Sequence, residues 1–177
     1  MALKYRIHGI ESIETGACGA DGAMGASLAA IGAIVEESAI FSIEEPEIAR
    51  ITVEGTDEPD IVSISHGGMK TFKFSTRDMN VDTLVRILGG SVTDEVYTAP
   101  VNSNTKIWQS VEIIGKYVDG SRAKIEIPKA LIFAKMTAPF TDSESGVLEV
   151  TCEVATPTNA SGVALAPYTY TQEVPAA

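Results

Sequence analysis

Apolar and polar side chains alternate most regularly between residues 107 and 136. A period of two residues is that of a half-buried strand, so the segments 107–118 and 122–127 are predicted to form an antiparallel hairpin. The Asp119-Gly120 pair between them is a strong turn signal, because glycine accepts the positive φ that a tight turn requires. The pattern therefore predicts an antiparallel sheet with one dry face.

The length of the loop in this hairpin decides which residues face each other. A two-residue loop would pair core positions with solvent positions. We favour a three-residue loop, Asp119-Gly120-Ser121, because it places Ile113 opposite Ile127. The same loop places Tyr117 opposite Ala123. This register keeps the apolar side chains of both strands on one face.

One segment has the period of a helix rather than a strand. Between Asp78 and Gly90 four apolar residues recur at helical spacing, which predicts an amphipathic helix at about residues 78–89. Asp78 or Asn80 can cap its start, and Gly89-Gly90 can cap its end. A helix this short is not stable alone, so it is expected to lie against the sheet. The apolar stripe consists of Val81, Leu84, Val85 and Leu88.

The remaining chain contains several short segments with the alternation of strands. Pro128 cannot donate to a ladder, so residues 130–136 are predicted to form a third strand or a bent continuation. The sequence therefore predicts a mainly β fold, an antiparallel β-sandwich or barrel with one short flanking α-helix. The further strand segments are 4–10, 33–43, 48–53, 61–65, 70–75, part of 91–105 and 147–154.

The chain divides into three predicted regions. Residues 1–32 form an N-terminal segment whose Gly/Ala-rich part, 16–32, is interpreted as a long mobile loop ordered by a partner. Residues 33–154 form the β-sandwich domain. Residues 155–177 form a C-terminal arm, which lacks charge from 155 to 172. Two interpretations of this arm stay open: an extended arm packed on a neighbouring subunit, or a free tail.

Composition excludes several classes of protein. The 177 residues carry 13 basic and 24 acidic side chains, a net charge of −11, which argues against gripping nucleic acid or binding an anionic membrane. The N-terminus has no signal-peptide pattern, and Cys18 and Cys152 are read as unpaired thiols, so a soluble cytoplasmic protein is expected. With only His8 and His66 available, neither a metal site nor a catalytic constellation is recognisable. We therefore expect no enzyme activity and no cofactor.

The acidic charge is concentrated in one region. Between residues 36 and 60 nine acidic residues stand against Arg50 alone, which is −8 of the net −11. Such a run is usually a solvated face, but a surface that repels an anion is the sharper interpretation. If copies closed into a ring with this face inward, DNA could pass without binding. The candidate residues for the acidic face are Glu44, Glu45, Glu47, Glu54, Asp57, Glu58 and Asp60.

Residues 33–45 resemble a segment of the major tail proteins of long-tailed phages (siphophages). In that segment a strand with acidic and small residues runs into Phe41-Ser42-Ile43-Glu44-Glu45. The likeness covers about residues 30–155, by pattern and element order more than by identity. One departure is the Gly-rich character of the N-terminal loop. The other matching parts are 48–53, the Phe72/Phe74 strand, the helix ending at Gly89-Gly90, 123–136 and 147–154.

The resemblance implies a structural subunit without catalytic residues. Six copies would close into a ring, and rings would stack into the tail tube through which DNA passes during ejection. Partners would be other copies and, at the tube ends, tape-measure or tail-terminator proteins; the location would be the virion tail, assembled in the host cytoplasm. By position, 16–32, 44–60 and the C-terminal arm are candidates for ring-to-ring contacts. The residues selected for contacts between subunits are Leu28, Ile31, Tyr168 and Tyr170.

Other functional classes remain open at this stage. A monomeric β-barrel adaptor or ligand-binding module would have an enclosed apolar pocket and covered sheet edges. A contractile-tail or type VI secretion tube subunit is similar in fold. An enzyme is the third alternative and depends only on His66 and Cys152, which would have to meet in a cleft.

Overall fold

The computed structural model describes residues 9–51, 54, 61–102, 105–141 and 144–174. These residues form twelve strands, one 3-10 turn and one α-helix, so the prediction of a mainly β, antiparallel fold is confirmed, as an open sandwich rather than a closed barrel. The strands are β1 Ile10–Ala17, β2 Ala29–Ala30, β3 Ile40–Ile43, β4 Glu47–Ile51, β5 Ile61–His66, β6 Lys70–Thr76, β7 Ser91–Thr93, β8 Val96–Thr98, β9 Ile107–Gly115, β10 Arg122–Thr137, β11 Val147–Val154 and β12 Thr169–Glu173. The helix α1 spans Val81–Leu88, and the 3-10 turn spans Ala20–Gly22.

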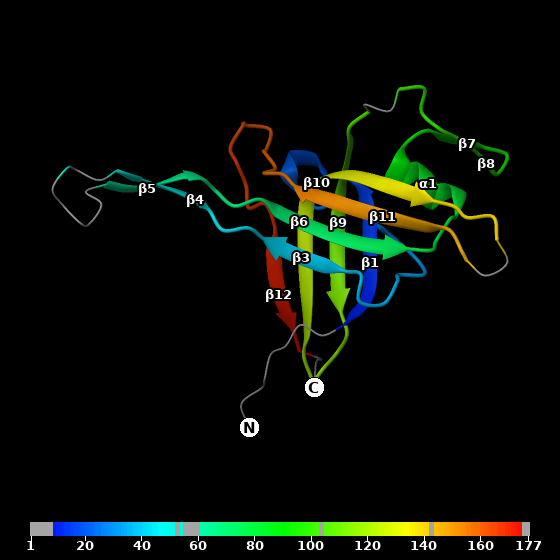
Figure 1. Cartoon of the computed structure of the whole chain (residues 1–177), viewed down its shortest axis with the longest axis horizontal. Coiled ribbons are helices and arrows are strands. Elements are labelled where there is room, and N and C mark those ends of the chain that lie inside the picture. The colour runs from blue at the N-terminus through cyan, green and yellow to red at the C-terminus, as the bar shows by residue number, and fades with distance from the viewer. Residues whose placement is uncertain (1–8, 52–53, 55–60, 103–104, 142–143, 175–177) are drawn as a thin grey trace.

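Two layers share one strand. The main sheet has the order β2-β1-β9-β10-β11-β6-β3, and β12 also pairs with β10. In Figure 1 the strands β3, β6 and β11 cross diagonally over β1, β9 and β10. The first half of β10 pairs with β9 and β12, and its second half, from Ala130, pairs with β11. β10 therefore belongs to both layers.

The bend in β10 occurs at Pro128. The register with β9 shifts between Ile127 and Ala130, which is a bulge at Pro128-Lys129. Pro128 has no N–H to give to the ladder, and its carbonyl oxygen accepts a hydrogen bond of 2.7 Å from the Ser110 hydroxyl. Residues 130–137 thus continue β10 beyond the bend. Of the two predicted alternatives, the bent continuation is correct and the separate third strand is not.

The predicted loop of the β9–β10 hairpin is wrong, although the predicted faces are correct except at Tyr117, which is 46% exposed. Ile113 lies opposite Ile125, not Ile127, and Val118 bridges Ser121 across a two-residue turn. Asp119 and Gly120 both have positive φ, 53° and 80°, as a type I′ turn requires.

A bulge on the first strand restores the alternation. Between the pair Ile114–Lys124 and the pair Val118–Ser121 lie three residues on one side and two on the other. The extra residue shifts the register by one and returns the apolar side chains to the dry face. Tyr117 lies in this segment and packs against Arg122, whose Cζ is 4.6 Å from the ring centroid, so the predicted Tyr117–Ala123 pair does not form.

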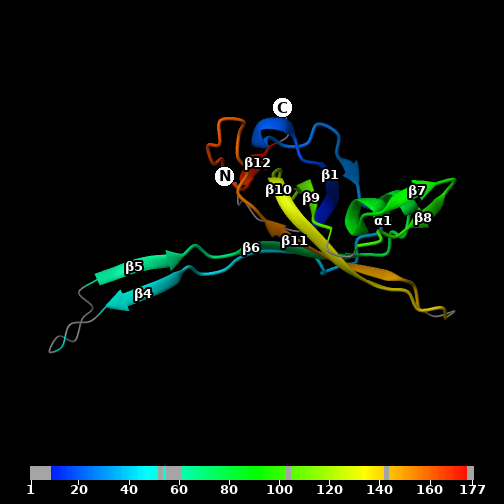
Figure 2. The same cartoon turned by 90° about the horizontal axis from the view of Figure 1, so that it is seen from above.

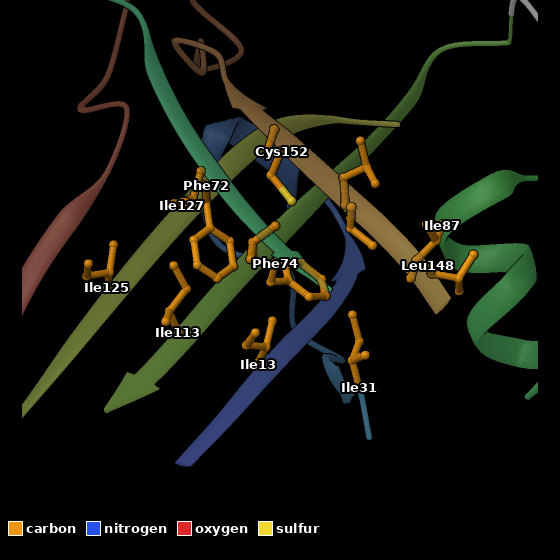
Figure 3. Packing of buried hydrophobic residues seen from close by; sticks show 14 residues of the cluster. Ile13, Ile31, Phe72, Phe74, Ile87, Ile113, Ile125, Ile127, Leu148 and Cys152 are labelled. Carbon is orange, nitrogen blue, oxygen red and sulfur yellow. The ribbon is translucent and has the colours of Figure 1, made fainter. Parts of the chain in front are cut away.

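The core lies between the two layers. Phe72 and Phe74 of β6 stack with ring centroids 5.3 Å apart and face Ile13 and Ile113 from the other layer, as Figure 3 shows. Cys152 of β11 lies in the same core and is fully buried. The largest fully buried aliphatic side chains are Ile13, Ile87, Val111, Ile127, Leu148 and Val150.

The helix closes one end of the core with a face slightly different from the predicted one. Thr83 and Ile87 are its buried residues, and Leu84 and Leu88 pack beside them. The predicted stripe contained both leucines but was rotated, because Thr83 is buried through its hydrogen bond to Asp78 (3.0 Å) rather than by apolarity. Asn80 caps the start, accepting the Asp82 N–H at 3.1 Å, and Gly89 ends the helix with a φ of 76°.

The Gly/Ala-rich segment is held to the body, contrary to the prediction of a long mobile loop. β1 continues through Gly16 to Ala17, and β2 pairs back onto β1. Arg86 of α1 donates hydrogen bonds to the carbonyl oxygens of Ala29 (2.6 Å) and Ala30 (3.2 Å). The glycines serve close approach of the backbone, since a Cβ on Gly16 would lie 2.3 Å from the Ser27 carbonyl oxygen.

Other predicted elements differ mainly in their extent. The predicted strand 33–43 is a strand only over β3, with an isolated bridge between Ile34 and Thr76. The segment 91–105 forms the small β7–β8 hairpin. The predicted strand 4–10 lies mostly outside the described residues, as do residues 52–53. The segment 147–154 matches β11.

Candidate assembly surfaces

The most prominent surface feature is a hairpin that leaves the body. The strands β4 and β5 pair with each other in a separate two-stranded sheet. We call this hairpin the arm; it is distinct from the C-terminal arm at residues 155–177. Figures 1 and 2 show the arm projecting from the end of the β3–β6 pair, away from the sandwich. At its base the Glu44 N–H donates to the Met69 carbonyl oxygen at 2.9 Å. Gly68 passes so close that a Cβ there would lie 1.7 Å from the Glu44 carbonyl oxygen.

The arm exposes apolar side chains on both strands. Ile48 lies opposite Ile64, and Val62 is two residues further along the same face. These side chains are 44% (Ile48), 67% (Ile64) and 59% (Val62) exposed. An isolated two-stranded hairpin is marginally stable in water at best, and clustered exposed apolar side chains mark a contact site. The arm therefore has the properties of a surface that another molecule covers.

The structure places the predicted acidic residues on and around this arm. Glu44, Glu45 and Glu47 lie exposed at its base, where β3 passes into β4. Glu54 is exposed beyond the end of β4. Asp57, Glu58 and Asp60 lie outside the described residues. The structure thus groups three of the seven candidates at one place, which is a junction between arm and sheet rather than a sheet face.

A second surface is formed by sheet edges. The layer β10-β11-β6-β3 has β3 at one edge, and in the described part of the chain β3 pairs with β6 alone. At the other edge, the segment 133–137 of β10 pairs with β11 alone among the strands that the structure describes. Exposed edge strands present unpaired N–H and C=O groups and pair readily with other chains. The layer is therefore open on both sides.

The outer face of the same layer is balanced in charge and also exposes the apolar side chains of Ile40 and Phe133. Lys73, Lys135, Glu149 and Glu153 point outward, because they alternate with the buried positions of β6, β10 and β11. Lys135 and Glu149 form an ion pair of 3.6 Å between their Nζ and Oε2 atoms. Two cations and two anions leave no net charge among these four. The excess negative charge therefore lies elsewhere, at the arm base among other places.

The residues predicted to contact other subunits fall in different environments. Ile31 is only 4% exposed and belongs to the core of its own chain, so its selection is wrong. Its neighbours made it look like a loop residue, whereas β2 and Arg86 turn it inward. Tyr168 packs on Phe41 with ring centroids 5.3 Å apart. Leu28 is half-buried and Tyr170 is exposed, and for these two the prediction stays a prediction.

The C-terminal arm is paired within its own chain. β12 forms an antiparallel ladder with β10, with Tyr170 opposite Ile125. Arg122 holds this ladder through Glu173 (2.6 Å) and also contacts Glu11 (3.1 Å). The hydrogen bond to Glu173 contributes most to raising the pKa of Arg122. A free tail therefore does not describe residues 169–173, and packing of this segment on a neighbouring subunit stays a prediction.

A second polar cluster lies next to it on the same sheet. Lys124 contacts Glu112 at 2.8 Å and Glu126 at 3.1 Å. The hydrogen bond from Lys124 to Glu112 contributes most to raising the pKa of Lys124. Lys124 thus links the two glutamates, Glu112 and Glu126, which lie opposite each other on β9 and β10.

The two thiols are partly or fully buried, and neither forms a disulfide. Burial raises the pKa of Cys152 to about 12, which removes its thiolate at neutral pH. Burial also raises the pKa of Cys18. Among the described residues no group of three or more His, Cys, Asp and Glu could hold a metal ion. The side chains of His8 and His66 lie outside the described part of the chain. The predicted meeting of His66 and Cys152 in a cleft therefore stays a prediction.

One apolar pocket opens at the end of the sandwich. It measures about 200 Å³ and lies between the layers, next to the N-terminal end of β1. Its lining includes Ile10, Phe41, Phe72, Ile113 and Ile125. Such a pocket is of a size and character that could take a small apolar group.

Two features were missed by the sequence analysis. The open edge of β10 was missed because its alternation looks the same whether or not a neighbour pairs with it. The close approach of Gly68 to Glu44 at the base of the arm was the second. Adjacent glycines between two strands could have indicated close approach of backbones, since glycine allows what a Cβ forbids.

No protein-family model matches the chain, and no curated protein sequence matches it. Within the described residues, no helix has the length and apolar character needed to cross a membrane.

Proposed function

We propose that this chain is a structural subunit that assembles with copies of itself into stacked rings, as the tail tube subunit of a phage. The observation that carries the proposal is the four-stranded layer β10-β11-β6-β3, which is open at both edges. Its strands alternate in direction, so the two edge strands run in opposite directions. The β3 edge of one copy can therefore continue the ladder onto the β10 edge of the next in the antiparallel sense.

Contacts of this kind build rings rather than pairs. Each copy uses two different edges, so the contact is heterologous, and a heterologous contact closes into a ring when the rotation per copy permits. Closure would also remove the exposed edges, which are otherwise sites of uncontrolled pairing. The number of six copies per ring comes from the resemblance to phage tail proteins.

The arm supports stacking of one ring on another. It projects beyond the body, and its apolar face needs a cover that its own chain does not supply in the described residues (Figure 2). A neighbouring ring could bury the apolar face of the arm in the same way for every copy. In the assembled tube, Ile48, Val62 and Ile64 would be buried between rings, with the carboxylates of the arm base at the junction.

Passage of DNA requires a bore that does not hold phosphates. The outer face of the open layer carries balanced charge, and Glu44 and Glu45 add negative charge where it meets the arm. Tight contact with DNA needs several Lys or Arg side chains free to neutralise phosphates. On this face Lys135 is paired with Glu149. The proposed tube would therefore let DNA pass without specific binding.

Location and partners follow from the same proposal. The subunit would be assembled in the host cytoplasm and end in the virion tail. A tube needs a defined length and a closed end, so tape-measure and tail-terminator proteins would be its partners there. No membrane and no enzymatic step belongs to this function.

The state of assembly tests the proposal directly. Purified protein should sediment as a species much larger than a monomer, with a fraction that rises with concentration, and electron micrographs should show rings or tubes. A protein that stays monomeric from micromolar to millimolar concentration would contradict the proposal.

A monomeric ligand-binding module is the second candidate. The apolar pocket of about 200 Å³ at the end of the sandwich is the observation that favours it. Native mass spectrometry of the purified protein distinguishes the two. A monomer that retains a small apolar molecule supports the module, whereas ligand-free oligomers support the tube subunit.

A further inference from the structure

The directions of the backbone N–H and C=O groups on the two edge strands determine how one copy can pair with the next. In an antiparallel ladder, residues alternately direct their N–H and C=O groups to one neighbour and to the other. The Glu44 N–H bonds the Met69 carbonyl, so positions 42 and 40 also bond toward β6. Phe41 and Ile43 therefore direct their backbone groups away from β6, toward the open side.

The same reasoning applies to the opposite edge. The Ala155 N–H bonds the Lys129 carbonyl at 3.0 Å, so the residues at 131, 133, 135 and 137 bond toward β11. Ala134 and Met136 therefore direct their backbone groups outward. Each edge thus offers two residues, spaced two apart, with one donor and one acceptor each.

We propose that β3 of one copy pairs with β10 of a second copy in a single register, with Phe41 opposite Met136 and Ile43 opposite Ala134. This inference rests on the proposed self-assembly and specifies its contact. The register satisfies all four outward residues, whereas a shift by two residues leaves one residue on each edge unpaired. This register also keeps the inner side of one copy continuous with the inner side of the next, because all four side chains point to the inner side of the layer.

A pocket beside Ala134 fits this register. It is an apolar hollow of about 350 Å³ on the inner side of the β10 edge, next to the end of α1. Ile43 is 51% exposed in the single chain, and its side chain points to the inner side of the layer. Opposite Ala134, it would enter the pocket and be covered. The lining includes Ile87, Leu88, Tyr97, Ile107, Ile132 and Ala134.

The outer side of the same register places Ser42 opposite Lys135. This pair lies between the hydrogen-bonded pairs, where the side chains of an antiparallel ladder are closest. Both residues are exposed in the single chain. Within one chain their strands are separated by β6 and β11, three spacings of about 4.8 Å, which is too far for a disulfide. Any disulfide between these positions must join two molecules.

Cysteine pairs test the register. One sample carries Ser42→Cys and a second carries Lys135→Cys, both with Cys18→Ser to remove the half-buried native thiol. Mixed and oxidised, they should give covalent dimers, whereas each sample alone should not. A chain with both substitutions should give a ladder of bands that ends at the number of copies in the ring. Ser42→Cys mixed with Thr151→Cys is the matched control, because Thr151 lies on the same face but on an internal strand.

The outcomes separate the register from the function. Rings or tubes that crosslink through Phe133→Cys or Thr137→Cys instead of Lys135→Cys would overturn the register and leave the proposed function intact. Assemblies without crosslinks at any of these positions would show that other surfaces make the contact. A protein that never assembles would remove both proposals.

A substitution on the inner side gives an independent readout. Ile43→Asp should lower the yield of rings about tenfold or more, since a carboxylate cannot enter an apolar pocket without a large penalty. Val163→Asp is the control, because Val163 is similarly exposed but belongs to neither edge strand. Equal yields from the two variants would overturn the insertion of Ile43 into the pocket.

Discussion

The sandwich and the arm use the same kinds of residues in opposite ways. In the sandwich, isoleucines such as Ile13 and Ile127 are fully buried between two layers and stabilise the fold of one chain. In the arm, Ile48 and Ile64 lie opposite each other on a two-stranded ribbon and remain in contact with water. Burial of an aliphatic side chain contributes about 1.5–3 kcal/mol wherever it occurs. The sandwich gains this free energy on folding, whereas the arm can gain it only on association.

The largest expected effect concerns the arm and association. Ile48→Asp combined with Ile64→Asp should abolish long tubes, because two carboxylates would have to be desolvated in each contact between rings. The thermal midpoint of the body should change little, since neither residue contacts the core in the described structure. Sedimentation velocity and micrographs measure the first effect, and circular dichroism measures the second. Normal tubes from this variant would show that the arm does not mediate stacking.

A matched pair of truncations tests the difference in stability. Ile127→Ala should lower the free energy of unfolding by about 2–5 kcal/mol, because it leaves a cavity in a fully buried site. Ile64→Ala should change it by no more than about 0.5 kcal/mol, because this side chain is exposed. Urea unfolding of the dilute protein measures both values. Similar losses from the two truncations would mean that the arm is part of the cooperative core.

A glycine pair at the arm base tests how the two regions are joined. Gly68→Ala should reorient or loosen the arm, because its Cβ would meet the Glu44 carbonyl oxygen at 1.7 Å and the backbone must move. Gly67→Ala is the control, since a Cβ there meets nothing within 4 Å. We expect reduced assembly at a nearly unchanged thermal midpoint for Gly68→Ala, and wild-type assembly for Gly67→Ala. Equal assembly of both variants would contradict a fixed crossing at this point.

The smallest expected effect belongs to the body and depends on pH. Asp78 accepts hydrogen bonds from the N–H groups of Asn80 and Gly32 and from the Thr83 hydroxyl, at 3.0–3.2 Å. Partial burial opposes ionisation of this carboxyl, but these hydrogen bonds and Arg86 together outweigh it and lower the pKa. Because Asp78→Ala removes the acceptor of three hydrogen bonds, it should cost about 1–2 kcal/mol at neutral pH.

The sign of this pH dependence follows from the lowered pKa. The stabilisation by the ionised Asp78 is complete above its ordinary pKa of 3.8 and is lost as the pH falls through the lower pKa of the folded state. The difference in unfolding free energy between Asp78→Asn and the wild type should thus be constant from pH 5 upward and shrink in stronger acid. Urea midpoints measured across this range check it. A difference that grows in acid would contradict the assignment.

Much of the body was predictable because local patterns determine it. Alternation identified β11, β6 and the two strands of the central hairpin, and caps located α1 through Asn80 and Gly89. The hairpin register was not predictable, since a turn and a bulge compensate each other and leave the same faces buried. Only the positive φ of Asp119, which sequence does not reveal, distinguishes the solutions.

The placement of the candidate residues was harder to predict. Charge counting found the acidic segment but could not show that Glu44, Glu45 and Glu47 lie where an arm leaves the sheet. Composition suggested a loop around Ile31, whereas hydrogen bonds from Arg86, more than 50 residues away, turn that segment into the core. Such long-range contacts leave no local signal in the sequence. The open edges likewise depend on which strands become neighbours, and only the topology determines this.

The sharing of β10 between both layers has a consequence for slow motions of the protein. A layer cannot lift away from its partner without breaking the ladder of β10 on at least one side of Pro128. The amide protons of residues 124–126 and 130–132, which lie where β10 has neighbours on both sides, should accordingly exchange with deuterium only on global unfolding. Hydrogen–deuterium exchange would then find the slowest amides along one continuous strand, β10. They would lie on both sides of its bend at Pro128, a residue that has no amide proton.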